Sequence, residues 1–363
     1  MEPERTRKVV VAMSGGVDSS VAAALLAKEG YDVTGMMLRL WSEAGKEDLN
    51  RCCTPDAMML ARRVAAKLGI PFYVIDVKEK FREWVVEAFI QGYLAGMTPN
   101  PCLVCNRQIR WGLLLQQALS LGAEWLATGH YARIARDEQG RFLLLRALDA
   151  AKDQSYVLSV LGQQDLRHTL LPIGNYTKPQ VRELARKFGL PVAERSESQD
   201  LCFLAGEDYR DFLVRHAPEA MRPGQIVNRR GEVLGEHQGL AFYTIGQRKG
   251  LGVASSRPLY VVDKDFRQNL LIVGPLEELG KTTLHAAPVN WVLGEPPAER
   301  FRAEVKIRYT ATPLSATVIV ETPQQVRVEF DQPVRDITPG QRAVFYQGDV
   351  VVGGGTIVSA SNG

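Results

Sequence analysis

The chain has 363 residues, of which 45% are hydrophobic and 23% charged, and this composition predicts two or three packed domains rather than a disordered or fibrous chain. The formal net charge of +3 permits a nucleic-acid partner without arguing for one. No apolar run reaches about 18 residues, and the charged residues 1–8 lead straight into a strand pattern. We therefore expect a cytoplasmic protein with neither a signal peptide nor a membrane partner.

A glycine-rich stretch, Ser14-Gly15-Gly16-Val17-Asp18-Ser19-Ser20, lies between an apolar run at 9–13 and a helical pattern at 21–29. Adjacent glycines let the backbone approach a ligand closely, and the amides at a helix start favour an anion there. Asp18 would repel phosphate unless a cation lies between them, so we interpret it as a Mg²⁺ contact. The stretch is neither a Walker A loop nor a dinucleotide fingerprint.

The same stretch resembles the pyrophosphate loop, SGGxDS, of the N-type ATP pyrophosphatases. That resemblance implies cleavage of ATP to AMP and pyrophosphate, coupled to adenylation of an oxygen atom. An ordinary glycine turn between a strand and a helix is the alternative interpretation.

Strand and helix patterns alternate through the first half of the chain, which predicts an α/β domain with a doubly wound parallel sheet. The predicted strands are 9–13, 32–40, 72–77 and 125–128, and the further helices are 56–68, 79–95, 109–119 and 178–188. Ligands of such sheets lie beyond the carboxyl ends of the strands, at a switch point in strand order. Gly129 and His130 follow a strand and belong to that edge, where Leu38 is expected to meet the adenine.

Helical periodicity fades after about residue 210. A hairpin is predicted earlier, at 131–146, and two more are predicted around Arg229-Arg230-Gly231 and between 259–263 and 270–273. Alternating runs at 303–309, 316–320, 326–330 and 343–346 predict a small β-barrel. We therefore divide the chain into a nucleotide-binding domain at 1–208, a small β-rich domain at 209–278 and a C-terminal β-barrel at 279–363.

All five cysteines lie in the first of these domains: Cys52, Cys53, Cys102, Cys105 and Cys202. An odd number in a chain of this length argues against a disulfide framework. Cys52 and Cys53 fall in a polar loop and are interpreted as surface thiols. Two prolines stiffen the loop before Cys102, and Cys105 falls near the expected helix start, where the helix dipole favours a thiolate.

The residues alone leave several roles open for these thiols. Cys102 and Cys105 have the spacing of a redox pair or of half a zinc site, although no second pair completes a zinc set. Cys102, Cys105 and Cys202 together are also a candidate set of three thiolates on one iron–sulfur cluster.

Taken with the glycine loop, the two cysteine stretches closely resemble those of the bacterial tRNA-specific 2-thiouridylases. These stretches are Thr98-Pro99-Asn100-Pro101-Cys102-Leu103-Val104-Cys105-Asn106 and Ser198-Gln199-Asp200-Leu201-Cys202-Phe203. Other matching strings extend the resemblance over nearly the whole length. They are Lys152-Asp153-Gln154-Ser155-Tyr156, Gly246-Gln247-Arg248-Lys249-Gly250-Leu251-Gly252, Lys306-Ile307-Arg308-Tyr309 and Pro339-Gly340-Gln341.

The resemblance implies an ATP-dependent sulfurtransferase that adenylates the 2-oxygen of the wobble uridine of tRNA and replaces it with sulfur. Cys202 would carry a persulfide supplied by a sulfur-relay protein or a cysteine desulfurase, and Cys105 would be the second nucleophile. The central domain would bind tRNA, and Mg²⁺ would accompany the ATP. Some members have Asp where this chain has Cys102, so an essential carboxylate is not expected there.

The resemblance also assigns residues to each ligand. Those implied to bind ATP are Ala12, Met13, Ser14, Gly15, Gly16, Val17, Asp18, Ser19, Leu38 and Gly129. Those implied to line the target base are Asn100, Pro101 and Cys102. Those implied to contact the tRNA elsewhere are His130, Lys152, Asp153, Gln154, Arg308, Tyr309 and Gln341.

Two other functions use the same sequence features. An ATP-dependent amide ligase would use the loop on a small carboxylate, and RNA would not stimulate its pyrophosphate release. A non-enzymatic RNA-binding protein with a relic loop would not bind ATP.

Overall fold

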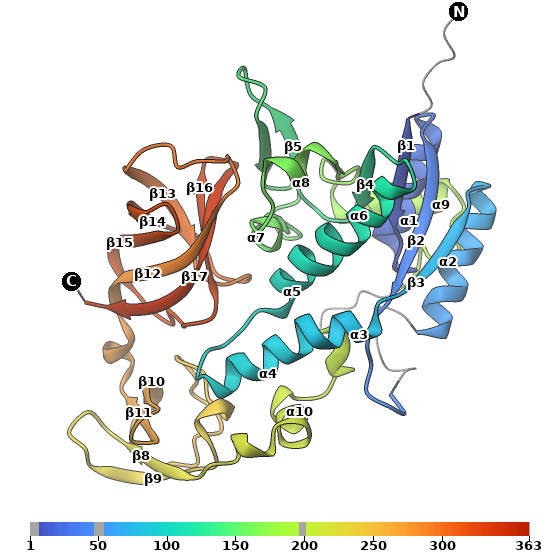
Figure 1. Ribbon diagram of the computed structural model, residues 1–363. Helices are drawn as coiled ribbons and strands as arrows, with labels where there is room; N and C mark the ends of the chain where they lie inside the picture. Colours follow the sequence, from blue (N-terminus) through green and yellow to red (C-terminus); the bar gives the residue numbers. More distant parts are fainter. Residues whose placement is uncertain (1–6, 47–53, 196–200, 363) are drawn as a thin grey trace, which may run out of the picture.

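The computed structural model describes residues 7–46, 54–195 and 201–362 (Figure 1). Its first sheet is parallel and has the strand order β3-β2-β1-β4-β7. The strands are β1 (Lys8–Ala12), β2 (Asp32–Arg39), β3 (Phe72–Asp76), β4 (Trp125–Thr128) and β7 (Thr169–Leu170). The chain adds strands on one side of β1 and then crosses to the other, so the predicted switch point lies between β1 and β4.

Helices cover both faces of this sheet. Val9 and Val11 of β1 pack in a core with α1 (Val17–Lys28), α2 (Pro55–Leu68) and α9 (Lys178–Lys187). Val10 points to the other face and packs with Trp111 and Leu115 of the long helix that ends in α6 (Leu115–Ser120). Successive side chains of a strand point to opposite faces, so one valine-rich strand supplies both cores.

The helix that carries the first cysteine pair begins earlier than the sequence predicted. It runs through α5 (Pro101–Val104), the π-helical segment η3 (Cys105–Leu114) and α6, whereas the predicted start was residue 109. Asn100 caps its first turn, because its side-chain oxygen accepts the Cys102 N–H at 3.1 Å. The wider π turn disturbs the 3.6-residue periodicity, which hid this start from the sequence pattern. Cys105 therefore lies inside a helix and not in a loop.

The remaining helical and hairpin predictions of this half are confirmed. The stretch predicted at 79–95 is one helical rod of α3 (Lys78–Phe81), η2 (Arg82–Val86) and α4 (Glu87–Leu94). The hairpin of β5 (Arg133–Arg136) and β6 (Phe142–Leu145) turns at Gly140, where φ is +80°. Two short helices, α7 (Ser155–Leu158) and α8 (Gln163–Arg167), follow it.

The middle of the chain forms a small sheet of the order β10-β11-β8-β9 after helix α10 (Tyr209–His216). Its strands are β8 (Gly224–Val227), β9 (Val233–His237), β10 (Tyr260–Asp265) and β11 (Leu270–Gly274). β8 pairs antiparallel with β9, and β10 with β11, as the two hairpin predictions require. A parallel pairing of β11 with β8 joins the two hairpins.

The C-terminal part is a closed barrel of six strands, because β12 pairs with both β15 and β17. The strands are β12 (Lys281–Trp291), β13 (Arg300–Lys306), β14 (Leu314–Thr322), β15 (Gln325–Val334), β16 (Arg342–Gln347) and β17 (Val350–Ser361). β12 and β17 were not among the predicted runs. β17 contains Gly353-Gly354-Gly355, which is unusual in a strand, but a Cβ at Gly355 would lie 2.9 Å from Val289.

The barrel is docked on the first domain through buried polar contacts. The guanidinium of Arg342 donates to Ser159 Oγ of the first domain at 2.8 Å and, within the barrel, to the carbonyl oxygen of Gly354 at 2.7 Å. The Tyr156 hydroxyl donates to the carbonyl oxygen of Arg342 at 2.9 Å, and Val350 of β17 pairs with Leu145 of β6. Burial lowers the pKa of Arg342 to about 10, so the side chain remains charged near neutral pH. The barrel is thus fixed relative to the sheet.

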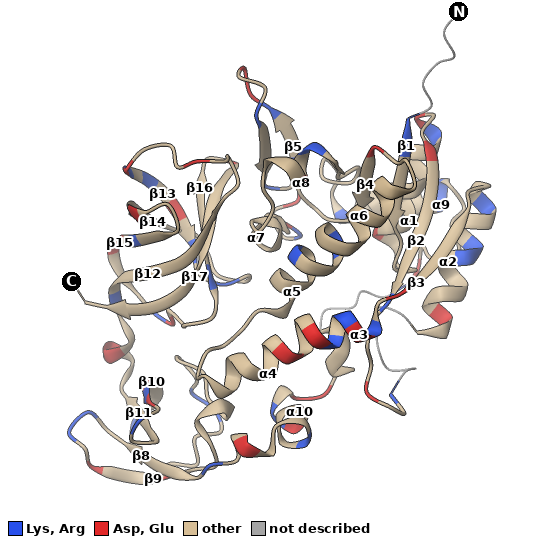
Figure 2. Cartoon of the chain, in the orientation of Figure 1, with Lys and Arg blue, Asp and Glu red and all other residues tan. Residues whose placement is uncertain are grey.

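Lys and Arg occur on all parts of the chain, including the β8–β9 turn and the helix of α5 and α6 (Figure 2). None of the helices within the described ranges combines the length and the apolar character needed to cross a membrane.

We expect Arg342→Met to destabilise the protein by about 2 kcal/mol, because the buried oxygens of Ser159 and Gly354 lose their donor. Thermal and urea unfolding measure the effect. Arg335→Met is the matched control, since Arg335 is exposed on the same barrel. Equal stability of the two variants would show that the buried guanidinium contributes nothing to docking.

Candidate active site

A cavity of about 1130 Å³ lies at the carboxyl edge of the first sheet. Its wall includes the glycine loop after β1, Leu38 of β2 and residues 128–131 after β4. Cys102 and Cys105 line it from the α5 helix, and Tyr309 and Gln341 line it from the barrel. These segments were predicted to contribute to one site, and residues from each of them line the same cavity.

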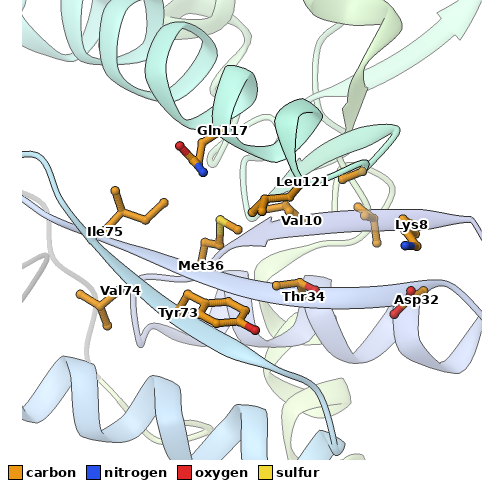
Figure 3. Close-up of a pocket in the computed structure, with 12 residues that line it drawn as sticks. Lys8, Val10, Asp32, Thr34, Met36, Tyr73, Val74, Ile75, Gln117 and Leu121 are labelled. Carbon is orange, nitrogen blue, oxygen red and sulfur yellow. The ribbon is translucent and has the colours of Figure 1, made fainter.

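A smaller hollow of about 540 Å³ lies elsewhere, between the sheet and α6 (Figure 3). Met36 and Tyr73 on the strands face Gln117 of α6 and Leu121, which follows the end of that helix. None of the residues that line this hollow was predicted to have a chemical role, so the larger cavity is the candidate active site.

The glycine loop packs tightly against its neighbours. Gly15 has φ of +70°, and a Cβ there would lie 2.2 Å from the carbonyl oxygen of Ala57 in α2. Gly16 is the N-cap of α1, and the hydroxyl of Ser19 accepts the Ser14 N–H at 3.2 Å. Ser20 is fully buried and donates to the Gly16 carbonyl at 2.8 Å, so it stabilises the loop instead of facing a ligand.

A second glycine brings the β4 loop against the same helix start. A Cβ on Gly129 would lie 2.6 Å from the backbone nitrogen of Ser19 and 2.7 Å from the carbonyl carbon of Asp18. No side chain fits between these backbones. The predicted ATP residues Gly129 and Asp18 to Ser19 are therefore brought into contact, and the backbone there is accessible from the cavity.

Asp18 has two partners that the sequence did not indicate. Its carboxylate accepts hydrogen bonds from Lys178 Nζ at 2.7 and 2.8 Å and from the Tyr131 hydroxyl at 2.8 Å. Lys178 starts α9 and its side chain is only 10% exposed. Arg195 donates to the carbonyl oxygen of Gly15 at 2.7 Å. Lys178 and Arg195 both line the cavity.

His130 is held neutral beside the nucleotide loop. Its Nδ1 lies 2.8 Å from Thr128 Oγ1, and its ring lies 5.7 Å from that of Trp111. Burial, with a smaller effect from the nearby charge of Arg110, lowers the pKa of His130 to about 3. A neutral imidazole can hydrogen-bond to a base or ribose, but it is not a cationic phosphate contact near neutral pH.

The cysteines that the structure describes come from two segments of the chain. Cys105 is buried in a cluster with Phe203, while Cys202 packs against the same cluster. Cys102 is exposed in the cavity wall, and Leu201 and Leu204 on either side of Cys202 also line it. Cys102, Cys105 and Cys202 form no disulfide here. Cys52 and Cys53 lie outside the described residues.

Ion pairs join the segment that follows Cys202 to the segment that follows β2. Lys46 Nζ lies 2.5 Å from Glu207, and Arg215 Nε lies 2.9 Å from Glu43. The hydrogen bond from Arg215 is the largest cause that lowers the pKa of Glu43 to about 2. These contacts position Leu204 and the residues after it at the cavity.

The barrel holds the segment that leads into the α5 helix. The Thr98 N–H donates to the Pro339 carbonyl at 2.8 Å, and Gln341 Nε2 donates to the Thr98 carbonyl at 2.8 Å. Gly340 has φ of +91°, and a Cβ there would lie 2.7 Å from the Thr98 nitrogen. The string Pro339-Gly340-Gln341 thus places Asn100, Pro101 and Cys102 in the cavity wall.

Of the other residues implied to contact tRNA, some line the cavity and others bond within the protein. Lys152 and Gln154 line the cavity, and Gln154 also accepts the Tyr131 N–H at 2.9 Å. Asp153 accepts the Ala147 N–H and the Ser155 hydroxyl, so its carboxylate shapes the turn. Arg308 donates to the Ile245 carbonyl and to Thr338 Oγ1, which joins the middle domain to the barrel. Asp153 and Arg308 are not part of the cavity wall.

Tyr309 is the exposed aromatic side chain of this region. It is 39% exposed, and its ring packs edge-on against Tyr156 with a centroid distance of 6.1 Å. Lys306 Nζ lies 5.7 Å from the centroid of the Tyr309 ring. An aromatic face at a cavity mouth, with a cation beside it, suits stacking on an unpaired base.

The polar cavity residues that sequence reasoning missed include Arg110, Tyr131, Lys178 and Arg195. Arg110 carried a local signal, because it stands one helical turn beyond Asn106 and donates to Asn106 Oδ1 at 2.7 Å. Lys178 carried none, since it is 160 residues from its partner Asp18.

The residues present fit a nucleoside triphosphate. The backbone at Gly16 and Gly129 is approachable, the start of α1 supplies amides, and Lys178 and Arg195 supply positive charge. The described residues do not bring three or more His, Cys, Asp or Glu side chains together as a metal site.

A parallel sheet with a glycine loop at its switch point, followed by two small β domains, defines a nucleotide-binding class with added β modules. The family described as the tRNA methyl transferase HUP domain matches residues 7–206. A tRNA methyl transferase PRC-barrel domain matches 210–275, and an aminomethyltransferase beta-barrel domain matches 281–357.

Curated relatives are similar over nearly the whole chain. The tRNA-specific 2-thiouridylase MnmA of Moorella thermoacetica is 51% identical over 97% of this chain and 99% of its own length. The protein of the same name from Chloroflexus aggregans is also 51% identical, over 96% of this chain and 98% of its own length. The chain belongs to the family of tRNA-specific 2-thiouridylases.

We expect Gly129→Ala to weaken ATP binding about tenfold or more, because the new methyl group must displace the backbone of α1. Calorimetric titration with ATP measures this. Gly162→Ala is the control, since a Cβ there meets its nearest atom only at 4.0 Å. Equal affinities for ATP in the two variants would mean that this close approach does not shape the site.

The low pKa of His130 makes stability depend on pH. The unfolded state takes up a proton below about pH 6.5 while the folded state does not, so stability falls as the pH drops from 6.5 toward 3. We expect the stability advantage of the wild type over His130→Asn to shrink by about 1.4 kcal/mol between pH 7.5 and pH 5.5. Urea unfolding at both pH values measures it. If the stability difference between the wild type and His130→Asn is the same at both pH values, His130 is not held neutral in the folded protein.

Proposed function

We propose that this chain is an ATP-dependent sulfurtransferase that converts the wobble uridine of tRNA to 2-thiouridine. The observation that carries the proposal is the single cavity in which the glycine loop, the cysteine helix and Tyr309 of the barrel meet. Full-length similarity to tRNA-specific 2-thiouridylases supports the same reaction. A cavity built from three parts of the chain suits a large RNA whose target nucleotide is turned out of its stack.

The first half-reaction activates the base. The uridine 2-oxygen attacks the α-phosphorus of ATP, pyrophosphate leaves, and the oxygen becomes part of a good leaving group, AMP. The start of α1, with Ser14 and Ser19 beside it, would hold the phosphates, and Asp18 would hold Mg²⁺. Leu38 lies in the cavity wall where the adenine is expected.

The second half-reaction delivers sulfur. The terminal sulfur of a Cys202 persulfide attacks C2 and AMP leaves, which joins the base to Cys202 through two sulfurs. The Cys105 thiolate then attacks Cys202 Sγ, so the electron pair of the broken S–S bond passes to the sulfur on C2. The products are 2-thiouridine and a Cys105–Cys202 disulfide, which a dithiol reductant returns to two thiols. The packing of both residues against one cluster favours this pairing.

Several partners follow from this scheme as proposals. The persulfide would come from a sulfur-relay protein or a cysteine desulfurase in the cytoplasm. Asn100, Pro101 and Cys102 would surround the target base, with Lys152, Gln154 and Tyr309 farther along the same wall. Asp153, Arg308 and Gln341 would act on tRNA mainly through the backbone that they position.

We expect Cys105→Ser and Cys202→Ser each to abolish 2-thiouridine formation while ATP binding survives, because a serine hydroxyl is neither a persulfide carrier nor a ready nucleophile at neutral pH. Mass spectrometry of nucleosides from tRNA, with a persulfide donor present, measures the product. Cys102→Ser is the informative comparison. The disulfide scheme tolerates it, whereas a three-thiolate cluster would lose its iron and its activity together.

The effect of tRNA on the rate of pyrophosphate release distinguishes the proposed function from the amide-ligase alternative. A tRNA-modifying enzyme releases pyrophosphate faster with tRNA than without it, and a ligase acting on a small carboxylate does not. Near wild-type thiolation by Cys105→Ser would refute the paired mechanism even if tRNA stimulated the release of pyrophosphate.

A further inference from the structure

Residues 95–99 connect helix α4 to the cysteine helix and lead directly into the residues expected to surround the target base. Residues 98–102 all line the cavity. Beyond the turn that ends α4, residues 97–100 form neither a helix nor a strand. The position of this connecting segment therefore depends on contacts with other parts of the chain.

Helix α4 and the barrel hold two points of the connecting segment. A Cβ on Gly92 of α4 would lie 2.9 Å from the ring of Pro99, so the helix and this ring are in direct contact. The barrel bonds to both the N–H and the carbonyl of Thr98. These contacts hold Thr98 and Pro99, whereas the atoms that come closest to a Cβ on Gly96 belong to the middle domain.

The middle domain packs against Gly96 through Phe266, which lies in the turn between β10 and β11. A Cβ on Gly96 would overlap the Phe266 ring, which supplies the three atoms nearest to that position. Gly96 also has φ of +80°, and its N–H donates to the Tyr93 carbonyl at 3.0 Å where α4 ends. A glycine at this position therefore provides both the left-handed end of the helix and the space for the ring.

The Phe266 ring is held in place by its own domain. Asp265 Oδ1 accepts the backbone N–H groups two and three residues later, at 2.9 and 3.0 Å, which fixes the turn. Lys264 Nζ lies 5.5 Å from the centroid of the Phe266 ring and donates to the Tyr243 carbonyl at 3.0 Å. The ring is 39% exposed, so it packs at the surface between two domains and not in the core of one.

The string 246–252, which the function has not yet explained, supports a second contact between the same two parts. Thr98 Oγ1 lies 3.5 Å from Thr244 Oγ1, and Gln247 Oε1 accepts the Thr244 N–H at 3.1 Å. The carbonyl of Gln247 accepts the N–H of Val261 in β10 at 2.9 Å. The string thus joins β10 to the residue beside Thr98, and the middle domain contacts the connecting segment at both Gly96 and Thr98.

We propose that Phe266 is a positioning residue for the thiolation reaction, because its ring holds Gly96 and thereby sets where residues 100–102 lie in the cavity wall. The inference rests on the proposed function, which supplies the uridine that these residues would surround. It gives the middle domain a part in the chemical step that is separate from binding RNA. A displacement of about 1 Å in such a wall can slow a reaction about 100-fold.

A middle domain that served only to bind RNA would use this exposed aromatic side chain differently. Phe266 would then stack on the RNA, and its removal would raise the tRNA concentration needed for half-saturation without slowing the saturated enzyme. A positioning residue has the opposite effect, because tRNA still binds but its target base meets a displaced wall. Measuring the saturated rate and the half-saturating concentration separately distinguishes the two roles.

The first experiment compares Phe266→Ala with Leu234→Ala, which removes another apolar side chain of the middle domain with a similar exposure of 37%. Enzyme loaded with persulfide is mixed with ATP and increasing concentrations of tRNA, and mass spectrometry of nucleosides measures the 2-thiouridine formed in one turnover. We expect Phe266→Ala to lower the rate at saturating tRNA about tenfold, while half-saturation and ATP affinity stay within about twofold of the wild type.

Two further variants control this comparison. Leu234→Ala should match the wild type in rate and in half-saturation. Phe266→Met keeps a flexible apolar side chain that can fill part of the space beside Gly96, so it should recover part of the rate. This partial recovery also keeps the inference testable if Phe266→Ala folds poorly.

The second experiment changes the sizes of both partners in the contact. Gly96→Ala places a methyl group where the ring lies and should slow the saturated rate. Adding Phe266→Ala makes room for the methyl group, so the double variant should be faster than Gly96→Ala, whereas independent effects would make it slower than either single variant. Gly140→Ala controls for backbone strain, since Gly140 has the same φ of +80° and its Cβ would meet no contact within 4 Å. Gly140→Ala should leave the rate unchanged.

The outcomes separate failure of this inference from failure of the proposed function. Wild-type protein that forms no 2-thiouridine from tRNA, ATP and persulfide overturns both. Wild-type protein that forms it, with Phe266→Ala as fast as Leu234→Ala, overturns the role of Phe266 alone. Weaker half-saturation at an unchanged saturated rate overturns that role as well and identifies Phe266 as an RNA contact. A double variant slower than both single variants shows that Phe266 does not act through Gly96.

Discussion

The site depends on two places where backbone meets backbone with no side chain between them. Gly15 approaches the carbonyl of Ala57, and Gly129 approaches the first turn of α1. A methyl group at either position would occupy space already taken by the main chain. The Gly15 contact sets the distance between the β1 loop and α2, and the Gly129 contact sets the distance between the β4 loop and the start of α1 at the edge of the cavity. Gly15 also needs its positive φ, which other residues adopt only with strain.

The remaining parts of the cavity are positioned by elements that supply little chemistry themselves. The barrel is fixed by Arg342 and Tyr156, and through Pro339 and Gln341 it then holds Thr98, which precedes the cysteine helix. The middle domain is joined to the barrel through Arg308 and the Ile245 carbonyl. The β modules thus shape the cavity by fixing the backbone of the segment that precedes the cysteine helix.

Several ionisable groups of the cavity are held by other parts of the protein. Asp18 is balanced by Lys178, and Arg110 is bonded to Asn106, while His130 is kept neutral by burial. The carboxylate of Asp18 is therefore compensated before ligands enter, whereas Arg195 donates to a neutral carbonyl oxygen. Such pairing lowers the cost of keeping charged groups in a partly buried site.

The sequence by itself determined the nucleotide end of the site. The loop from Ser14 to Ser20 and the strand–helix alternation are local patterns, and in a doubly wound sheet they place the ligand at one edge. The pair of thiols at Cys102 and Cys105 was equally recognisable, because the two residues lie close together in the sequence. The start of their helix at Pro101 was missed, since a π-helical segment breaks the period that sequence reasoning relies on.

Tertiary structure alone decided which distant groups meet these local motifs. Lys178 reaches Asp18 across 160 residues, and Gln341 reaches the Thr98 carbonyl across 243. It also decided that Asp153 and Arg308 bond within the protein, although the family resemblance implied contacts with tRNA. Periodicity and motif spacing describe a residue's neighbours along the chain, whereas the partner of a buried charge is fixed by how separate elements pack.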